Sequence, residues 1–142
     1  MPVSTAGRTD DAQAAGVILV IEDDADVRGG TVAVLEAEGY RAVGVPTAYE
    51  ALALLRARKV KPSVILLDLM MPGMTGGQFR AEQLQDAELG TVPVILVSAF
   101  PNTLEVTQKG SLRAAAALMK PVEPRRLLAV IARYCRNHRP AV

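Results

Sequence analysis

Five short apolar runs alternate along this chain with segments of helical periodicity. The runs are rich in Val, Ile, Leu and Ala and show little alternation with polar residues, which is typical of strands buried on both faces. Such strands belong to parallel sheets that are covered by helices on each side. The predicted strands are Val17 to Ile21, Arg41 to Val45, Val64 to Asp68, Val92 to Ser98 and Ala116 to Met119.

The segments between and after these runs carry apolar residues about three and four positions apart, as helices with one buried face do. The first segment has a narrow apolar stripe that includes Val27 and Leu35, and Gly39 closes it. The segment before the fourth strand has the weakest pattern. We therefore expect helices over about 27–38, 48–55, 77–85, 104–109 and 127–135.

Five strand–helix units joined by right-handed crossovers predict a doubly wound α/β sandwich with helices on both faces of the sheet. A chain of 142 residues has room for one such domain. We place this domain at residues 16–137. Residues 1–15 are small and polar and are predicted to form a flexible tail, and 138–142 form a second, shorter tail.

Composition excludes several classes of function. The 16 Lys and Arg residues nearly balance the 15 Asp and Glu residues, so no basic field for nucleic acid or membrane lipid is expected. The single cysteine, Cys135, excludes an internal disulfide and fits a reducing compartment. No apolar run is long enough to span a bilayer, and no signal peptide is visible. These features predict a soluble cytoplasmic protein.

Polar residues with chemical potential stand at four of the predicted strand ends. In open α/β sheets, ligands bind beyond the carboxyl ends of the strands. The first strand is followed by Glu22, Asp23 and Asp24, and the third ends in Asp68. If these strands are neighbours, the carboxylates converge. Two carboxylates about 4 Å apart repel by roughly 4 kcal/mol at an effective dielectric constant of 20, so a cation is required. Carboxylate oxygens select a hard cation such as Mg²⁺.

The remaining strand ends supply a hydroxyl at Ser98 and an ammonium at Lys120. A metal with open positions, an ammonium and a hydroxyl together form a binding set for an oxyanion such as phosphate. Asp68 stands at the tip of a buried strand, directly before a loop that contains Pro72 and Gly73. A carboxylate in this position can itself act as a nucleophile and form an aspartyl-phosphate.

These motifs resemble those of the receiver domains of bacterial two-component response regulators. The resemblance covers about residues 17–136 and rests on four segments in order, each at a strand end. It implies a flavodoxin-like fold with the strand order 2-1-3-4-5. The segments are Val20 to Asp24, Leu66 to Gly76, Val97 to Ala99 and Met119 to Pro121.

The resemblance also implies a role for each matching residue. Asp68 would accept a phosphoryl group from a histidine kinase or a histidine phosphotransfer protein. Ser98 and Lys120 would contact the phosphoryl oxygens, and the Lys120–Pro121 bond is expected to be cis. The ligands expected for Mg²⁺ are Glu22, Asp23, Asp68 and the backbone carbonyl of Met70.

The implied function is a phosphorylation-dependent switch, not an enzyme acting on a separate substrate, since a receiver catalyses only its own phosphorylation and dephosphorylation. Output would pass to a downstream protein or a homodimer through the face formed by the fourth helix, the fifth strand and the last helix. The chain is either a stand-alone receiver or the receiver fragment of a longer regulator.

One position departs from the family pattern. An aromatic residue usually stands three positions before the lysine, where this chain has Ala117. The phosphorylation chemistry does not depend on it, but the coupling from site to signalling face does. We expect either a signal carried by helix 104–109, with Phe100 as a substitute lever, or transfer of the phosphoryl group without strong conformational output.

Two other functions use similar residues. A Mg²⁺-dependent phosphatase also has an aspartyl nucleophile, but its usual Asp-x-Asp-x-Thr pattern is not matched after the first strand. A non-phosphorylated binding module of the same fold normally lacks an acid or the lysine, and this chain has all of them. Asp24 and Asp26 are expected to cap the first helix and are not assigned to the metal.

Overall fold

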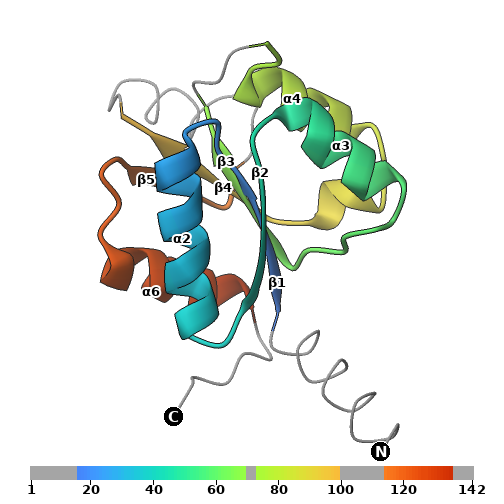
Figure 1. The fold of residues 1–142 in the computed structure, drawn as a ribbon. Coiled ribbons are helices and arrows are strands. Elements are labelled where there is room, and N and C mark those ends of the chain that lie inside the picture. The colour runs from blue at the N-terminus through green and yellow to red at the C-terminus, as the bar shows by residue number, and fades with distance from the viewer. Residues whose placement is uncertain (1–15, 70–72, 100–113, 136–142) are drawn as a thin grey trace, which may run out of the picture.

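A five-stranded parallel sheet in the order β2-β1-β3-β4-β5 forms the centre of the molecule (Figure 1). This order confirms the one that the resemblance implies. The computed structural model describes residues 16–69, 73–99 and 114–135, to which the structural statements below refer. The strands are β1 (Val17–Ile21), β2 (Arg41–Val45), β3 (Val64–Asp68), β4 (Val94–Ser98) and β5 (Ala116–Met119).

Helices cover both faces of this sheet. Figure 1 shows α2 and α6 on one face and α3 and α4 on the other. Among the described residues, no helix is long and apolar enough to cross a bilayer. The helices are α2 (Ala25–Ala37), α3 (Ala48–Arg56), α4 (Gly76–Leu84) and α6 (Pro124–Tyr134), with a short 3₁₀ helix, η1 (Leu89–Thr91), before β4.

The alternation of side chains along the central strands explains why these strands are apolar throughout. In β3, Val64 and Leu66 pack in one core cluster with Leu35 of α2 and Ile131 of α6. The intervening residues of β3 pack in the other cluster, beneath α3 and α4. Because successive side chains in a strand point to opposite faces, a strand between two helix layers must be apolar at every position.

The bounds of β4 and of the four described helices differ from the predictions by one to three residues, and two of these differences have a clear local cause. The fourth strand begins at Val94, not at Val92, because residues 89–91 form the 3₁₀ helix and Val92 is its C-terminal cap. Helix α4 begins at Gly76, one residue earlier than expected, because Thr75 caps it. Its hydroxyl accepts from the Gln78 backbone N–H, and the Gln78 side chain accepts from the Thr75 N–H.

The predicted apolar stripe of the first helix is only partly buried. Leu35 is fully buried, whereas Val27 is 42% exposed. Val27 therefore belongs to the apolar stripe but not to the buried core. Val27 lies in the first turn of α2 and lines a cavity at the carboxyl edge of the sheet. The predicted helix 104–109, Phe100 and both predicted tails lie outside the described residues. Residues 136 and 137, at the end of the predicted domain, also lie outside them.

Candidate functional site

The register of the sheet brings the acidic residues together at its carboxyl edge. Ile21 of β1 pairs with Leu67 of β3, so the residues that follow each strand are neighbours. Carboxylate oxygens of Glu22, Asp23 and Asp68 all lie within 4.8 Å of one another. Glu22 and Asp68 are buried and Asp23 is exposed. The predicted convergence of these carboxylates is thus observed.

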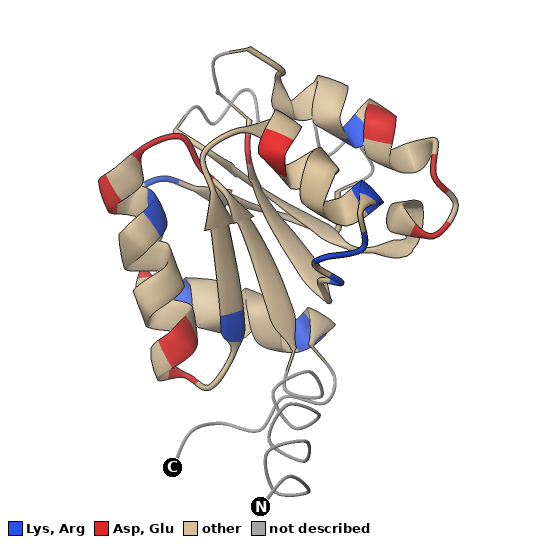
Figure 2. Ribbon diagram, turned by 45° about the vertical axis from the view of Figure 1, so that its right-hand side comes forward, with Lys and Arg blue, Asp and Glu red and all other residues tan. Residues whose placement is uncertain are grey.

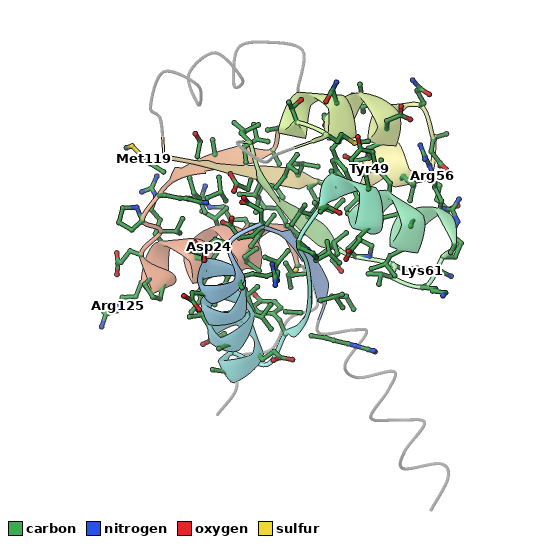
Figure 3. The ribbon with its side chains drawn as sticks, turned by 45° about the horizontal axis from the view of Figure 1, so that its top comes forward. Asp24, Tyr49, Arg56, Lys61, Met119 and Arg125 are labelled. Atoms are coloured by element: carbon green, nitrogen blue, oxygen red, sulfur yellow. The ribbon has the colours of Figure 1, made fainter. Side chains whose placement is uncertain are left out.

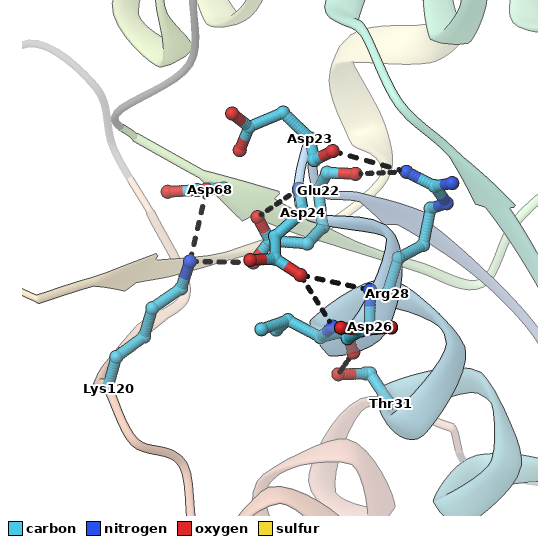
Figure 4. Close-up of polar contacts among 9 residues, drawn as sticks. Glu22, Asp23, Asp24, Asp26, Arg28, Thr31, Asp68 and Lys120 are labelled. Atoms are coloured by element: carbon cyan, nitrogen blue, oxygen red, sulfur yellow. Dashed lines mark hydrogen bonds and ion pairs between the residues drawn. The ribbon is translucent and has the colours of Figure 1, made fainter.

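Lys120 follows the edge strand β5, and its side chain reaches the same carboxylates (Figure 4). Its Nζ lies 2.6 Å from Glu22 Oε1 and 3.1 Å from Asp68 Oδ2. The Lys120 backbone N–H donates to the carbonyl oxygen of Ser98 at 2.8 Å, which continues the β4–β5 ladder by one residue. The Lys120–Pro121 peptide bond is cis, as the resemblance implies. One ammonium therefore joins two buried carboxylates.

The two carboxylates determine the protonation of Lys120. Partial burial lowers the pKa of its ammonium, but hydrogen bonds and charge attraction from Glu22 and Asp68 outweigh this effect. The net result is a pKa raised above the ordinary value of 10.5. Lys120 is therefore a permanent cation in the physiological range.

Asp24 holds the acidic segment against the start of α2. Its Oδ1 accepts from the backbone N–H groups of Asp26 and Val27 at 2.9 and 3.0 Å, so it is the N-cap of the helix. Its own N–H donates to Glu22 Oε2 at 3.2 Å. The prediction that Asp24 caps the helix is confirmed. Asp26 stands in the first turn, where it favours the helix dipole but is not the cap.

The structure describes Ser98 and Ala117 but not Met70. Ser98 is fully buried at the end of β4. The residue before it, Val97, pairs with Asp68 of β3. Met70, whose carbonyl is a predicted metal ligand, lies outside the described residues. Ala117 lies in β5, pairs with Leu96 and is half-buried against the core cluster beneath α3 and α4.

A cavity of about 580 Å³ opens beside the carboxylates. Most of its wall is apolar and comes from α2, from the central strands and from the segment between Lys120 and Leu127. Glu22, Asp68 and Lys120 form its polar end. The site therefore combines a charged centre with an apolar approach, as ligand sites commonly do.

Arg28, which stands at no strand end and matches no motif of the site, contacts the site from behind. Its Nη1 donates to the carbonyl oxygen of Glu22 at 2.9 Å (Figure 4). The sequence contains one signal of this contact: Arg28 stands four residues after the cap Asp24, and residues four apart share one face of a helix.

The charges at the site fit a divalent cation. Figure 2 shows the acidic segment between β1 and α2 at one edge of the sheet and a basic segment before β3 at the opposite edge. At the acidic edge, the Lys120 ammonium contacts Glu22 and Asp68, and Asp23 completes a cluster of three carboxylates. Carboxylate oxygens within a few ångströms of one another are the donor set that Mg²⁺ takes in proteins. Glu22, Asp23 and Asp68 are the residues that would hold it.

The fold and the acidic pocket match a known family of signalling domains. The model of the response regulator receiver domain matches residues 18–132. The chain therefore belongs to the response regulator receiver domain family of two-component signal transduction. Domains of this family work with histidine kinases and are not conventional enzymes.

Two curated relatives have different lengths. The DNA-binding response regulator MtrA of Mycolicibacterium paratuberculosis is 35% identical over 121 residues, which are 84% of this chain and 52% of MtrA. The chain thus spans about half the length of MtrA. Protein PilH of Pseudomonas aeruginosa is 32% identical over 114 residues, which are 80% of this chain and 93% of PilH.

Solved structures show the same fold. The receiver domain of a signal transduction histidine kinase from Syntrophus aciditrophicus has a TM-score of 0.77 at 27% identity, covering 86% of this chain and 91% of that one. The receiver domain of the sensor histidine kinase PA1611 from Pseudomonas aeruginosa has a TM-score of 0.72 at 24% identity, covering 86% and 98%. That structure has a magnesium ion coordinated in its active site cleft.

Proposed function

We propose that this protein is a phosphorylation-dependent switch whose phosphoacceptor is Asp68. One observation carries the proposal: the buried Asp68 carboxylate stands at the tip of β3, within 4.8 Å of two further carboxylates and 3.1 Å from the Lys120 ammonium. A carboxylate that receives a dianionic phosphoryl group needs cations close by, because they compensate the added negative charge. Lys120 is one such cation, and the clustered carboxylates could hold Mg²⁺ as a second.

The transfer is a displacement at phosphorus. An Asp68 carboxylate oxygen attacks the phosphoryl group of a phosphohistidine, the P–N bond breaks, and the electron pair leaves with the imidazole of the donor. Lys120 pairs with the phosphoryl oxygens as they approach Asp68. Glu22, Asp23 and Asp68 would hold Mg²⁺, which would supply further positive charge for the phosphoryl oxygens.

The remaining roles belong to the same proposal. Ser98 would donate its hydroxyl to a phosphoryl oxygen, and the Met70 carbonyl would be a further ligand of the metal. The functional domain is residues 16–137. A histidine kinase or a histidine phosphotransfer protein is the donor, and the output is read by a partner protein or a second copy at the face that includes β5 and α6.

A small phosphodonor tests this proposal without the unknown kinase. The chain is incubated with Mg²⁺ and acetyl phosphate, and the intact mass is followed with time. We expect a gain of one phosphate that is lost in Asp68→Asn and in the absence of divalent cation. Asp26→Asn, which removes an exposed carboxylate from the first turn of α2, is the matched control and should be phosphorylated normally.

Two results would contradict the switch. The first is no mass gain in the wild type, which would favour a non-phosphorylated binding module. The second is repeated turnover of simple phosphate esters, which would favour a phosphatase with the same nucleophile. Gain of phosphate on a residue other than Asp68, located by peptide mapping, would remove Asp68 from its assigned role.

A further inference from the structure

Arg28 of α2 contacts the backbone of the acidic segment, not its carboxylates. Its Nη1 donates to the carbonyl oxygen of Glu22 at 2.9 Å and more weakly to that of Asp23 at 3.5 Å. Side chains on a helix lean toward its N-terminus, so a long side chain in the second turn reaches back over the loop before the helix. The backbone N–H of Arg28 bonds to the Asp24 carbonyl at 2.9 Å, which places it one turn after the cap.

Gly44 of β2 leaves the space that the stem of Arg28 occupies. A Cβ at position 44 would stand 2.9 Å from Arg28 Cγ and 3.2 Å from its Cδ. Non-bonded carbons prefer separations of about 3.5–4.0 Å, so any larger residue would displace the stem. A glycine inside a strand often marks a close approach by another group. Here the nearest such group is the Arg28 side chain, and Val32 Cγ2 follows at 3.3 Å.

The guanidinium lies behind the acidic residues as seen from the site. Figure 4 shows Arg28 on the side of the Glu22–Asp23 backbone away from Lys120. A hydrogen bond to a carbonyl oxygen fixes the plane of the peptide that carries it. With the Glu22 carbonyl held from behind, the neighbouring carboxylates remain directed toward Asp68.

Arg28 also brings a positive charge near a predicted cation site, and this has the opposite effect. Charge repulsion alone predicts that removing the guanidinium strengthens Mg²⁺ binding. Loss of orientation predicts that removing it weakens binding, since groups that orient metal ligands are worth roughly 10–100-fold in affinity. The sign of the change therefore distinguishes the two effects.

We propose that Arg28 is a positioning residue of the metal site and that Gly44 keeps its place open. The inference rests on the proposed function, because it assumes that Glu22 and Asp23 bind Mg²⁺. It adds to that function a pair of residues that touch neither the metal nor the phosphoryl group and that nevertheless set the affinity for the metal.

The test measures the Mg²⁺ dissociation constant by isothermal titration calorimetry, with thermal unfolding of the metal-free protein as a check of folding. The variants are Arg28→Met, which keeps most of the stem, Arg28→Lys, which keeps the charge, and Gly44→Ala. The control is Arg56→Met, since Arg56 lies on α3, away from the acidic segment at Asp24 (Figure 3), and pairs with the partly exposed Glu82 at 2.8 Å.

We expect Arg28→Met to weaken Mg²⁺ binding roughly tenfold. Arg28→Lys should recover part of this loss, because an ammonium can still donate to one carbonyl. Gly44→Ala should also weaken binding. A further pair of variants, Arg28→Ala alone and Arg28→Ala with Gly44→Ala, should bind Mg²⁺ equally, because the stem that the Cβ would displace is absent from both. Arg56→Met should bind as the wild type does.

Unchanged or tighter Mg²⁺ binding by Arg28→Met overturns the inference. Tighter binding would mean that the guanidinium affects the metal only through charge repulsion. If that variant does not fold, unchanged binding in both Arg28→Lys and Gly44→Ala overturns it instead. In either case the proposed function stands as long as the wild type binds Mg²⁺ and gains phosphate. A wild type that binds no Mg²⁺ overturns the inference together with the metal site.

Discussion

Lys120 and Glu22 form a 2.6 Å ion pair at the carboxyl edge of the sheet. The same ammonium lies 3.1 Å from Asp68, so one cation compensates two buried carboxylates. Each carboxylate has lost most of its hydration and depends on Lys120 for the charge that replaces it. This arrangement connects the stability of the metal-free domain to a residue that is proposed to contact the phosphoryl group.

Lys120→Met should therefore destabilise the metal-free protein. Removing one partner of a largely buried ion pair leaves uncompensated charge, and the partial exposure of Lys120 reduces the cost to about 2 kcal/mol. Mg²⁺ should stabilise this variant more than the wild type, because the cation replaces the lost charge. Urea unfolding with and without Mg²⁺ measures both effects.

The exposed Lys61 provides the control for this experiment. Lys61→Met removes the same charge from the opposite edge of the sheet and should change stability by less than about 0.5 kcal/mol. Equal stabilities of the Lys120 and Lys61 variants would mean that the carboxylates do not depend on the ammonium.

Asp23 and Asp24 should differ in their effect on Mg²⁺ although they are adjacent. Asp23→Asn removes a charged oxygen from the carboxylate cluster, and ligand charge is a main determinant of affinity for hard cations, so we expect binding to weaken by roughly tenfold or more. Asp24→Asn should bind Mg²⁺ normally, because Asn caps a helix as well as Asp does. Calorimetric titration of the two variants makes the comparison, and equal affinities would remove Asp23 from the site.

The buried thiol of Cys135 should make the protein sensitive to alkali. Burial raises the pKa of this thiol from 9.0 to about 11. On raising the pH, the unfolded chain therefore loses the thiol proton first, so the free energy of unfolding falls between about pH 9 and pH 11 and is unaffected by this group below pH 9. The full loss is about 2–3 kcal/mol.

Tyr40 also affects stability in alkali, because burial and the charges of Cys135 and Glu38 raise its pKa to about 12. Cys135→Ala separates the contribution of the thiol from that of Tyr40. The variant should be less stable than the wild type at pH 8, and the difference should narrow as the pH approaches 11. A difference that stays constant over this range would show that the thiol does not titrate later in the folded state.

Much of this fold follows from local patterns. The strands β1, β2, β3 and β5 have the predicted bounds, because an apolar run flanked by polar residues or turns defines both ends of a buried strand. The convergence of Glu22, Asp23 and Asp68 also follows, since parallel strands present their carboxyl ends at one edge. The resemblance supplied the strand order, which the apolar pattern alone leaves open.

The start of β4 and the contact made by Arg28 were not predictable in the same way. The start of β4 was placed two residues early because Val92 continues the apolar run, whereas a 3₁₀ turn held by tertiary contacts occupies the preceding residues. The contact of Arg28 with the backbone before its own helix was missed because periodicity describes which face is buried and not where a long side chain reaches.

Gln83 explains the late start of β4 and leads to the last prediction. Its buried amide donates to the carbonyl oxygens of Leu89 at 2.7 Å and Val92 at 3.2 Å and accepts from Arg80 at 2.8 Å. Gln83→Met keeps the volume but leaves these buried groups without their partner, so we expect a loss of about 1–3 kcal/mol in urea unfolding. The exposed Gln85→Met is the control and should cost little. Because Gln83 lies near the C-terminal end of α4 and bonds to residues that precede β4, opposite the carboxyl ends of the strands, both variants should bind Mg²⁺ as the wild type does. A weakened affinity in Gln83→Met would show that this buried network extends to the site.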